Sequence, residues 1–206
     1  MLRFIDISQR LSSGIPVWPG DTEFQTFWKM QLQKGDSCNV GSVTMSLHTG
    51  THVDAPKHFL NDGSAISELK LETFMGPAIV MDLTNQPMVE KSSLANLNKN
   101  TPLRVLLKTM TANKEIFDST FSYLQPEAAE FLASLRIKLV GIDTPSVDKP
   151  DSKTLDTHKI LARQNIAILE NLFLNDVDAG IYELIAFPLN LAGMDASPVR
   201  AVLRKI

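Results

Sequence analysis

One short run limits how this chain can fold, because it holds three of the four histidines. It reads HTGTHVDAPKH, and its possible ligand residues are His48, His52, Asp54 and His58. Gly50 and Pro56 disfavour a helix here, and the β-branched residues between them favour an extended chain. Side chains alternate along an extended chain, so these four even-numbered residues are expected to share one face.

Such a face is typical of a metal site. Imidazole nitrogens and carboxylate oxygens bind zinc and other divalent transition metals, and one carboxylate can bridge two ions. The competing interpretation is a set of structural histidines held by hydrogen bonds. His158, alone in its segment, favours a structural role when taken by itself. Glu170 ends an apolar run, where a metal partner would offset the cost of burying it, unless it lies in solvent at a strand end.

The length and net charge of the chain limit the functional classes to which it can belong. The 206 residues and 44% hydrophobic content predict one domain spanning residues 1–206. A net charge of −3 without basic blocks argues against a nucleic-acid binder and leaves small uncharged or zwitterionic substrates open. Cys38 is the sole cysteine, which suits a reducing compartment. No signal peptide or membrane-spanning run is evident, so we expect a cytoplasmic protein without a membrane partner.

The order of apolar stretches predicts an α/β fold, with a mixed sheet and flanking helices. Strands are expected at residues 4–7, 40–47, 78–83, 103–109, 138–143, 166–169 and 197–204. The second of these is expected to be half-buried and to lead directly into the histidine run. One helix is expected to start at residues 125–132, with Pro126 in its first turn. Another is expected to be capped by Asp151 and Ser152, and one of its faces would carry Leu155, His158 and Ala162.

Trp18 lies on a loop between Pro16 and Pro19. A tryptophan fixed in this way either covers the edge of the core or offers a flat surface to an aromatic ligand. The residues alone favour the core-edge role. The loop at residues 143–148 follows a predicted strand, and functional groups gather at such ends in α/β sheets, but its role stays open, as does that of residues 197–200.

The pattern His-x-Gly-Thr-His-x-Asp-x-Pro-x-His from His48 to His58 resembles that of a family of metal-dependent cyclases and hydrolases. More closely, the chain resembles the bacterial kynurenine formamidases (arylformamidases), a subgroup of that family. The further stretches that carry this resemblance are residues 16–21, 143–148, 182–186 and 197–203. The resemblance covers nearly the whole chain and implies a swivelling β/β/α domain, commonly a homodimer.

The resemblance also implies roles for particular residues. It implies two zinc ions per chain, one held by His48, His52 and Asp54, the other by Asp54, His158 and Glu170. Nitrogen and oxygen ligands also accommodate manganese, iron or cobalt. His58 is implied as the acid/base residue, and Trp18 as a contact of the aromatic substrate, in place of the core-edge role.

The implied activity is hydrolysis of N-formyl-L-kynurenine to L-kynurenine and formate, in tryptophan degradation by the kynurenine pathway. A metal-bound hydroxide would attack the formyl carbon, the second ion would polarise its oxygen, and His58 would deliver a proton to the departing aryl amine. One alternative is hydrolysis of another aryl or cyclic amide, such as isatin. Another is a non-catalytic, metal-stabilised binding protein, in which His58 would be a further ligand or would support one.

Overall fold

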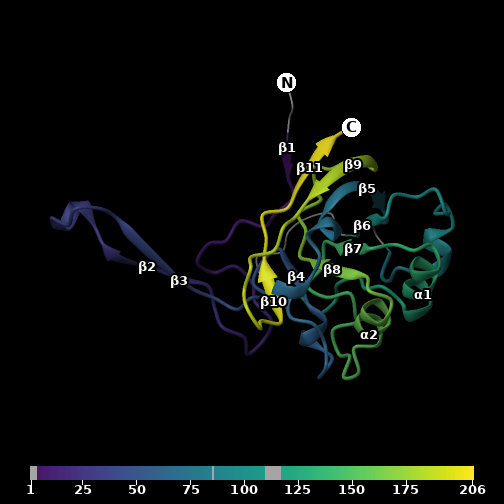
Figure 1. Ribbon diagram of the computed structural model, residues 1–206, viewed down its shortest axis with the longest axis horizontal. Coiled ribbons are helices and arrows are strands. Elements are labelled where there is room, and N and C mark those ends of the chain that lie inside the picture. The colour runs from purple at the N-terminus through teal and green to yellow at the C-terminus, as the bar shows by residue number, and fades with distance from the viewer. Residues whose placement is uncertain (1–3, 85, 110–116) are drawn as a thin grey trace.

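The computed structural model describes residues 4–84, 86–109 and 117–206. Its centre is a curled, mixed sheet of nine strands (Figure 1). In sheet order the strands are β1 (Phe4–Asp6), β11 (Val202–Lys205), β9 (Gly180–Ile185), β5 (Met75–Asp82), β6 (Arg104–Lys108), β7 (Leu139–Ile142), β8 (Ala167–Glu170), β4 (His52–Asp54) and β10 (Ala196–Pro198). The strands from β5 to β8 run parallel, and the pairs on either side of them are antiparallel. The sequence-based expectation of a mixed α/β sheet is confirmed.

The central strands are buried on both faces. Along β6, Leu106 points into one hydrophobic core, while Val105 and Leu107 point into the other. Residues of alternate parity thus serve opposite faces, as the pleat of a strand requires. This is why the parallel strands appear in the sequence as nearly continuous apolar runs, and why their positions could be predicted.

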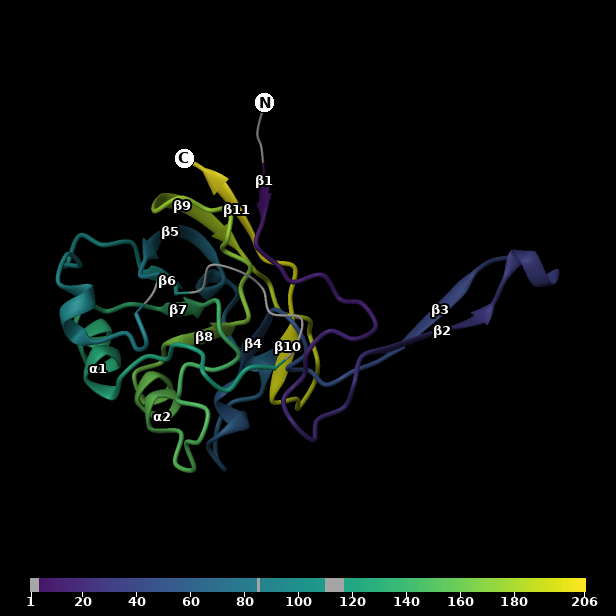
Figure 2. The same cartoon turned by 180° about the vertical axis from the view of Figure 1, so that it is seen from behind.

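Two α-helices cover one face of the sheet, α1 (Pro126–Ser134) and α2 (Asp156–Arg163) (Figure 2). Leu132 of α1 and Leu161 of α2 are fully buried in the same core. Pro126 lies in the first turn of α1, as expected. No helix within the described residues is long and apolar enough to cross a membrane. The single-turn 3-10 helices are η1 (Leu32–Lys34), η2 (Pro56–His58), η3 (Ile66–Glu68), η4 (Leu71–Thr73) and η5 (Lys91–Leu94).

The predicted cap of α2 is wrong. The helix begins at Asp156, several residues after Asp151 and Ser152, and Leu155 precedes it in a left-handed conformation with φ of 50°. The carboxylate of Asp148 instead accepts hydrogen bonds from the backbone N–H groups of Thr157 and His158. A side chain far upstream in the long loop between β7 and α2 therefore satisfies the first turn, at a distance along the chain that the usual capping pattern does not cover.

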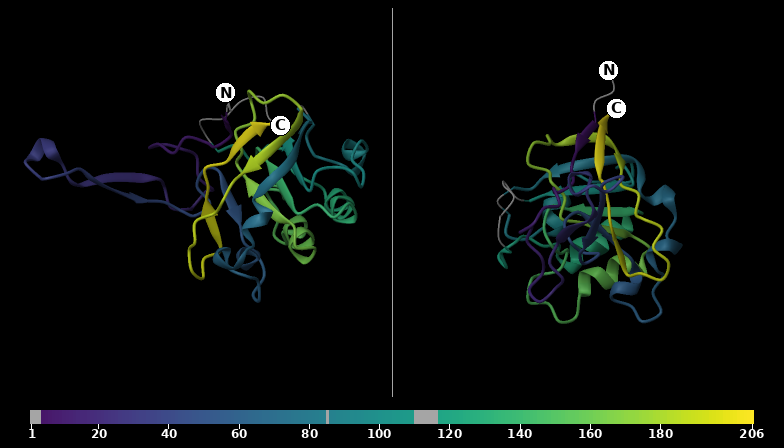
Figure 3. Two further views of the ribbon diagram at one scale, coloured as in Figure 1. Left: turned by 45° about the horizontal axis from the view of Figure 1, so that its top comes forward. Right: turned by 90° about the vertical axis from the view of Figure 1, so that its left-hand side faces the viewer.

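The prediction for residues 40–47 is also wrong in part. The strand β3 (Val40–Thr44) pairs only with β2 (Gln25–Met30), and this hairpin, the β2–β3 arm, projects away from the sheet (Figures 1 and 3). Its residues are largely exposed rather than half-buried. The strand also ends before His48, which lies in a turn. An alternating pattern fits a solvent-exposed ribbon as well as a sheet edge, so periodicity could not distinguish them.

The single strand predicted for residues 197–204 is two strands. β10 pairs with β4, whereas β11 pairs with β1 and β9 near the opposite end of the sheet order. Pro198 has no backbone N–H with which to extend the first ladder. The chain then crosses between the two places, through residues 199–201.

Candidate metal centre and active site

Sheet pairing brings distant parts of the chain together at the histidine run. β4 lies between β8 and β10, and its antiparallel register with β8 sets His52 directly opposite Glu170. Cross-strand neighbours of this kind have Cβ atoms about 4.5–5.5 Å apart. His158 approaches from α2. The residues expected as ligands from two distant parts of the sequence therefore meet in space.

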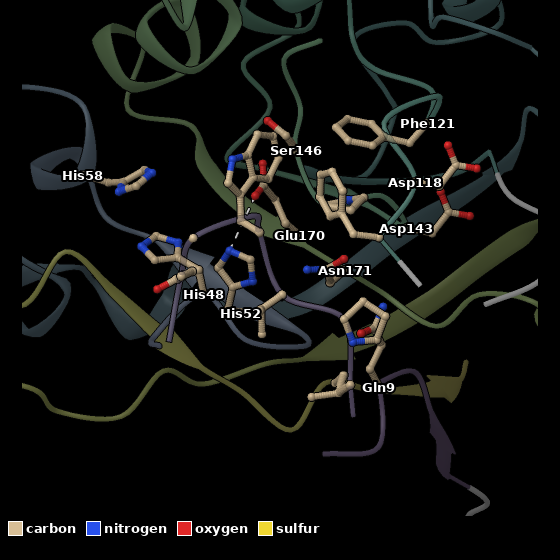
Figure 4. Close-up of a pocket in the computed structure, with 18 of the residues that line it drawn as sticks. Gln9, His48, His52, His58, Asp118, Phe121, Asp143, Ser146, Glu170 and Asn171 are labelled. Atoms are coloured by element: carbon tan, nitrogen blue, oxygen red, sulfur yellow. Dashed lines mark ion pairs between the residues drawn. The ribbon is translucent and has the colours of Figure 1, made fainter. Parts of the chain in front are cut away.

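Asp54 is the centre of the cluster. One carboxylate oxygen, Oδ1, lies 3.1 Å from Nδ1 of His48 and 3.3 Å from Nε2 of His52. The other, Oδ2, lies 3.4 Å from Nε2 of His158. Glu170 completes the arrangement with one oxygen 3.5 Å from His52 Nε2 and the other 3.3 Å from His158 Nε2. Figure 4 shows His48, His52 and Glu170 gathered at one end of a pocket.

The extended-face prediction is correct only for the middle of the run. His52 and Asp54 belong to β4, whereas His48 precedes it in a turn and His58 ends η2. Gly50 makes the turn with φ of 66°, a conformation that favours glycine. All four side chains nevertheless reach the same place, because the turn and η2 bend the chain back toward Asp54.

Two of the histidines are oriented by hydrogen bonds that they donate from the ring nitrogen facing away from Asp54. Nδ1 of His52 lies 2.8 Å from the carbonyl oxygen of Gly50, and Nδ1 of His158 lies 2.6 Å from the carboxylate of Asp148. Donation from Nδ1 leaves Nε2 able to bind a metal, an arrangement that metal-ligating histidines commonly show. The role of Asp148, open from sequence, is therefore to cap α2 and to orient His158.

The charges of the cluster depend on one another. Burial raises the pKa of Asp54, but the facing histidines lower it by more, so that it lies well below its usual range. Burial lowers the pKa of His52, but Asp54 and Glu170 raise it by more, to about 10. His158 is shifted in the same direction, by Asp148, Asp54 and Glu170 against the effect of burial. The raised pKa values of the two rings favour their protonated forms beside the carboxylates, and a divalent cation could take the place of those protons.

The unpaired polar atoms of the cluster fit a metal. Nε2 of His52 and both carboxylate oxygens of Asp54 are buried without a well-aligned hydrogen bond to the part of the chain that the structure describes. Such groups are costly to bury, and metal coordination would satisfy them. Donor atoms lie within 4.8 Å of one another in two groups that share Asp54, namely His48, Asp54 and His58, and His52, Asp54 and Glu170. How the ligands divide between two ions stays a prediction.

Sequence reasoning missed Asp195. Its Oδ2 lies 3.0 Å from Nε2 of His48 and 3.3 Å from Nδ1 of His58. The residue directly precedes β10, and its backbone oxygen accepts a hydrogen bond from Ala55 N–H. No local signal marks it, because only the pairing of β10 with β4 places it beside the histidines.

The cluster opens into a cavity of about 1060 Å³. Trp18 lines this cavity in edge-to-face contact with Phe117 and Phe121, with ring centroids 5.0 and 6.3 Å away, and is 41% exposed. Its indole therefore lines the cavity and also packs against the buried ring of Phe121. Arg10 and Lys153 also line the cavity, together with acidic side chains such as Asp118. An aromatic ligand carrying both charges would find complementary groups here.

Comparison with known proteins agrees with this geometry. The sequence pattern of the cyclase family matches residues 5–149. A kynurenine formamidase of Bordetella avium is 46% identical over 100% of both chains.

Among solved structures, a potential metal-dependent hydrolase with cyclase activity superposes with a TM-score of 0.86 and 30% identity, covering 100% of this chain and 99% of that one. Isatin hydrolase A of Labrenzia aggregata has a TM-score of 0.84 at 22% identity, covering 99% of this chain and 94% of that one, and so shows the fold alone. The fold, the histidine motif and the full-length similarity lead to one conclusion: the chain belongs to the cyclase family of metal-dependent hydrolases, to which its kynurenine formamidase relatives also belong.

Proposed function

We propose that this enzyme hydrolyses N-formyl-L-kynurenine to L-kynurenine and formate, in tryptophan degradation by the kynurenine pathway. The observation that carries the proposal is a buried cluster of histidines and carboxylates that opens into an aromatic-walled cavity. The substrate is an aryl formamide with an amino-acid side chain, which matches the aromatic and charged lining. The full-length similarity to kynurenine formamidases supports the same substrate.

The proposed metal content is two zinc ions per chain, with manganese, iron or cobalt as other candidates. His48, His52 and Asp54 would hold one ion, and Asp54, His158 and Glu170 the other. Bound zinc lowers the pKa of a coordinated water to about 7 and polarises carbonyl oxygens. The shared position of Asp54, which faces all three proposed histidine ligands, supports its role as the bridge.

The side chains supply the remaining steps. Water adds to the formyl carbon, the carbon–nitrogen bond breaks, and the aryl amine leaves with a proton. His58 lines the cavity and is partly exposed, so its ring can exchange that proton with the substrate. Trp18 would hold the aryl ring against its indole face, with Phe117 and Phe121 keeping the indole in place.

Two other functions have support in particular observations. Hydrolysis of isatin or another cyclic or aryl amide fits the fold shared with isatin hydrolase A and the roomy cavity. A metal-stabilised binding protein without turnover fits the close approach of His58 to His48 and Asp54, which would make His58 a further ligand. The substrate and metal experiments below separate these functions.

We expect chelation to abolish hydrolysis of N-formyl-L-kynurenine and added zinc to restore it, because the proposed reaction needs a metal to activate water at neutral pH. Release of kynurenine would be followed by absorbance, with isatin as a competing substrate. Magnesium is the matched control, because it prefers oxygen ligands and should not restore activity. Turnover that survives complete metal removal would contradict the proposal, and bound metal without any hydrolysis would favour the binding protein.

We also propose that the enzyme is a homodimer in which the β2–β3 arm packs against a second copy. The arm projects from the sheet and exposes large apolar side chains, with Trp28 60% and Val43 61% exposed. Exposed apolar surface that is rimmed by polar residues commonly marks a protein interface.

Trp28→Glu is expected to convert the dimer to a monomer, because it places a charge in the proposed contact. Light scattering coupled to gel filtration would measure the mass. Asp62→Ala, an exposed change outside the arm, is the control and should leave the dimer intact. A wild-type chain that is monomeric at all concentrations would rule out the dimer.

A single domain and a cytoplasmic location complete the proposal. The first and last described strands, β1 and β11, pair with each other in the same sheet, which supports one domain over residues 1–206. Cys38 is exposed and is the sole cysteine, so no intrachain disulfide is available, as suits a reducing compartment.

A further inference from the structure

His48 and His58 share one acceptor that lies outside the histidine run. Their rings lie side by side, with centroids 4.2 Å apart. Oδ2 of Asp195 is 3.0 Å from Nε2 of His48 and 3.3 Å from Nδ1 of His58, so one carboxylate oxygen contacts both rings. Nδ1 of His48 meanwhile faces Asp54. Asp195 thus connects a proposed metal ligand to the proposed acid/base residue.

The backbone holds Asp195 firmly in this position. Ala55 N–H donates to the Asp195 carbonyl oxygen at 2.8 Å, and Ile66 N–H donates to that of the preceding residue, Met194, at 2.9 Å. The next residue, Ala196, begins β10 opposite Asp54. A carboxylate anchored on both sides to the segment that carries His58 keeps its distance from that ring fixed.

We propose that Asp195 is the positioning residue for His58. Accepting a hydrogen bond from Nδ1–H fixes the tautomer and the orientation of the ring, and leaves Nε2 as the nitrogen that exchanges a proton with the leaving aryl amine. Because the same carboxylate also contacts His48, it keeps the His48 and His58 rings at a fixed distance from each other. The inference rests on the proposed function for the identity of the leaving group, whereas the orientation of His58 is a property of the chain itself.

Asp195→Ala is expected to lower kcat about 10–100-fold at saturating zinc, with KM little changed, because a partner that orients a functional histidine typically contributes this much. Asp62→Ala is the matched control, since Asp62 is an exposed carboxylate in the turn after η2 and outside the cavity. Asp195→Asn keeps the volume and one acceptor oxygen, so a smaller loss is expected. If Asp195→Ala does not fold, the kinetics of Asp195→Asn test the proposal in its place.

A double-mutant cycle separates action through His58 from action through the metal. In a His58→Ala background, Asp195→Ala should cause no further loss of kcat, because the residue it positions is already absent. An equal loss in both backgrounds would overturn the proposal and assign Asp195 to support of His48 instead.

The ring nitrogens give a test that does not depend on turnover. With only four histidines in the chain, long-range ¹H–¹⁵N spectra of metal-free protein can assign each tautomer. We expect the proton of neutral His58 on Nδ1 in the wild type, and loss of that preference in Asp195→Ala. An unchanged tautomer would overturn the inference. Failure of the proposed function would instead appear as wild-type protein without metal-dependent turnover, with these spectra unaffected.

Discussion

Asp54→Asn is expected to remove bound metal and to reduce hydrolysis to the level of the chelated enzyme. The substitution keeps the shape of the side chain but removes the charge that His48, His52 and His158 all face. Removing one partner from a buried charged cluster typically costs about 3–5 kcal/mol, so the free energy of unfolding of the metal-free chain should also fall by about that amount. Elemental analysis and denaturant titration would measure the two effects.

Asp151→Asn is the control for Asp54→Asn, because its carboxylate is 82% exposed and lies apart from the cluster. It should retain both metal and stability. Two metal ions per chain in Asp54→Asn would contradict the bridging role of this carboxylate.

His58→Ala is expected to keep its metal and to lose about 10²–10⁴-fold in kcat, the usual contribution of a positioned acid/base group. Because the His58 side chain is 33% exposed, its removal should leave the fold intact. Steady-state kinetics and metal analysis on the same preparation would test both statements.

Lys57→Ala, an exposed change at the adjacent position, is the control for His58→Ala and should be fully active. Full activity of His58→Ala would remove this residue from the chemistry. Loss of a metal ion in the variant would make His58 a ligand, as the donor group formed with His48 and Asp54 allows.

The fold could be predicted where a pattern in the sequence has one physical meaning. The sequence shows short apolar runs at β6, β7 and β8, and runs of this length predict strands. The structure buries these strands on both faces, which explains why the runs are almost continuously apolar. Alternation at residues 40–47 fits both a strand at a sheet edge and a strand in an exposed two-stranded ribbon. Only the tertiary structure shows that this strand belongs to the β2–β3 arm. The cap of α2 comes from Asp148, which lies outside the segment where local rules apply.

The site shows the same division. His48, His52, Asp54 and His58 could be singled out because the chain places them within one short run. His158 was assigned as a ligand through the resemblance, since a single histidine has no distinctive pattern. For Glu170 the cost of burying its carboxylate already favoured a metal partner, and the resemblance then assigned it to the second ion. Asp195 has no such pattern either, and only the register of β10 with β4 brings it to His58.

The place of β4 in the sheet also sets the order in which the site can be assembled during synthesis. Its two neighbours are β8 and β10, which both follow far downstream of the histidine run, since β8 begins at Ala167 and β10 at Ala196. The histidine run therefore leaves the ribosome long before the strands that will flank it. Nascent chains must keep three closely spaced histidines and an aspartate without their final partners until both flanking strands have been synthesised. Any metal bound in that interval would be held by an unfinished set of ligands.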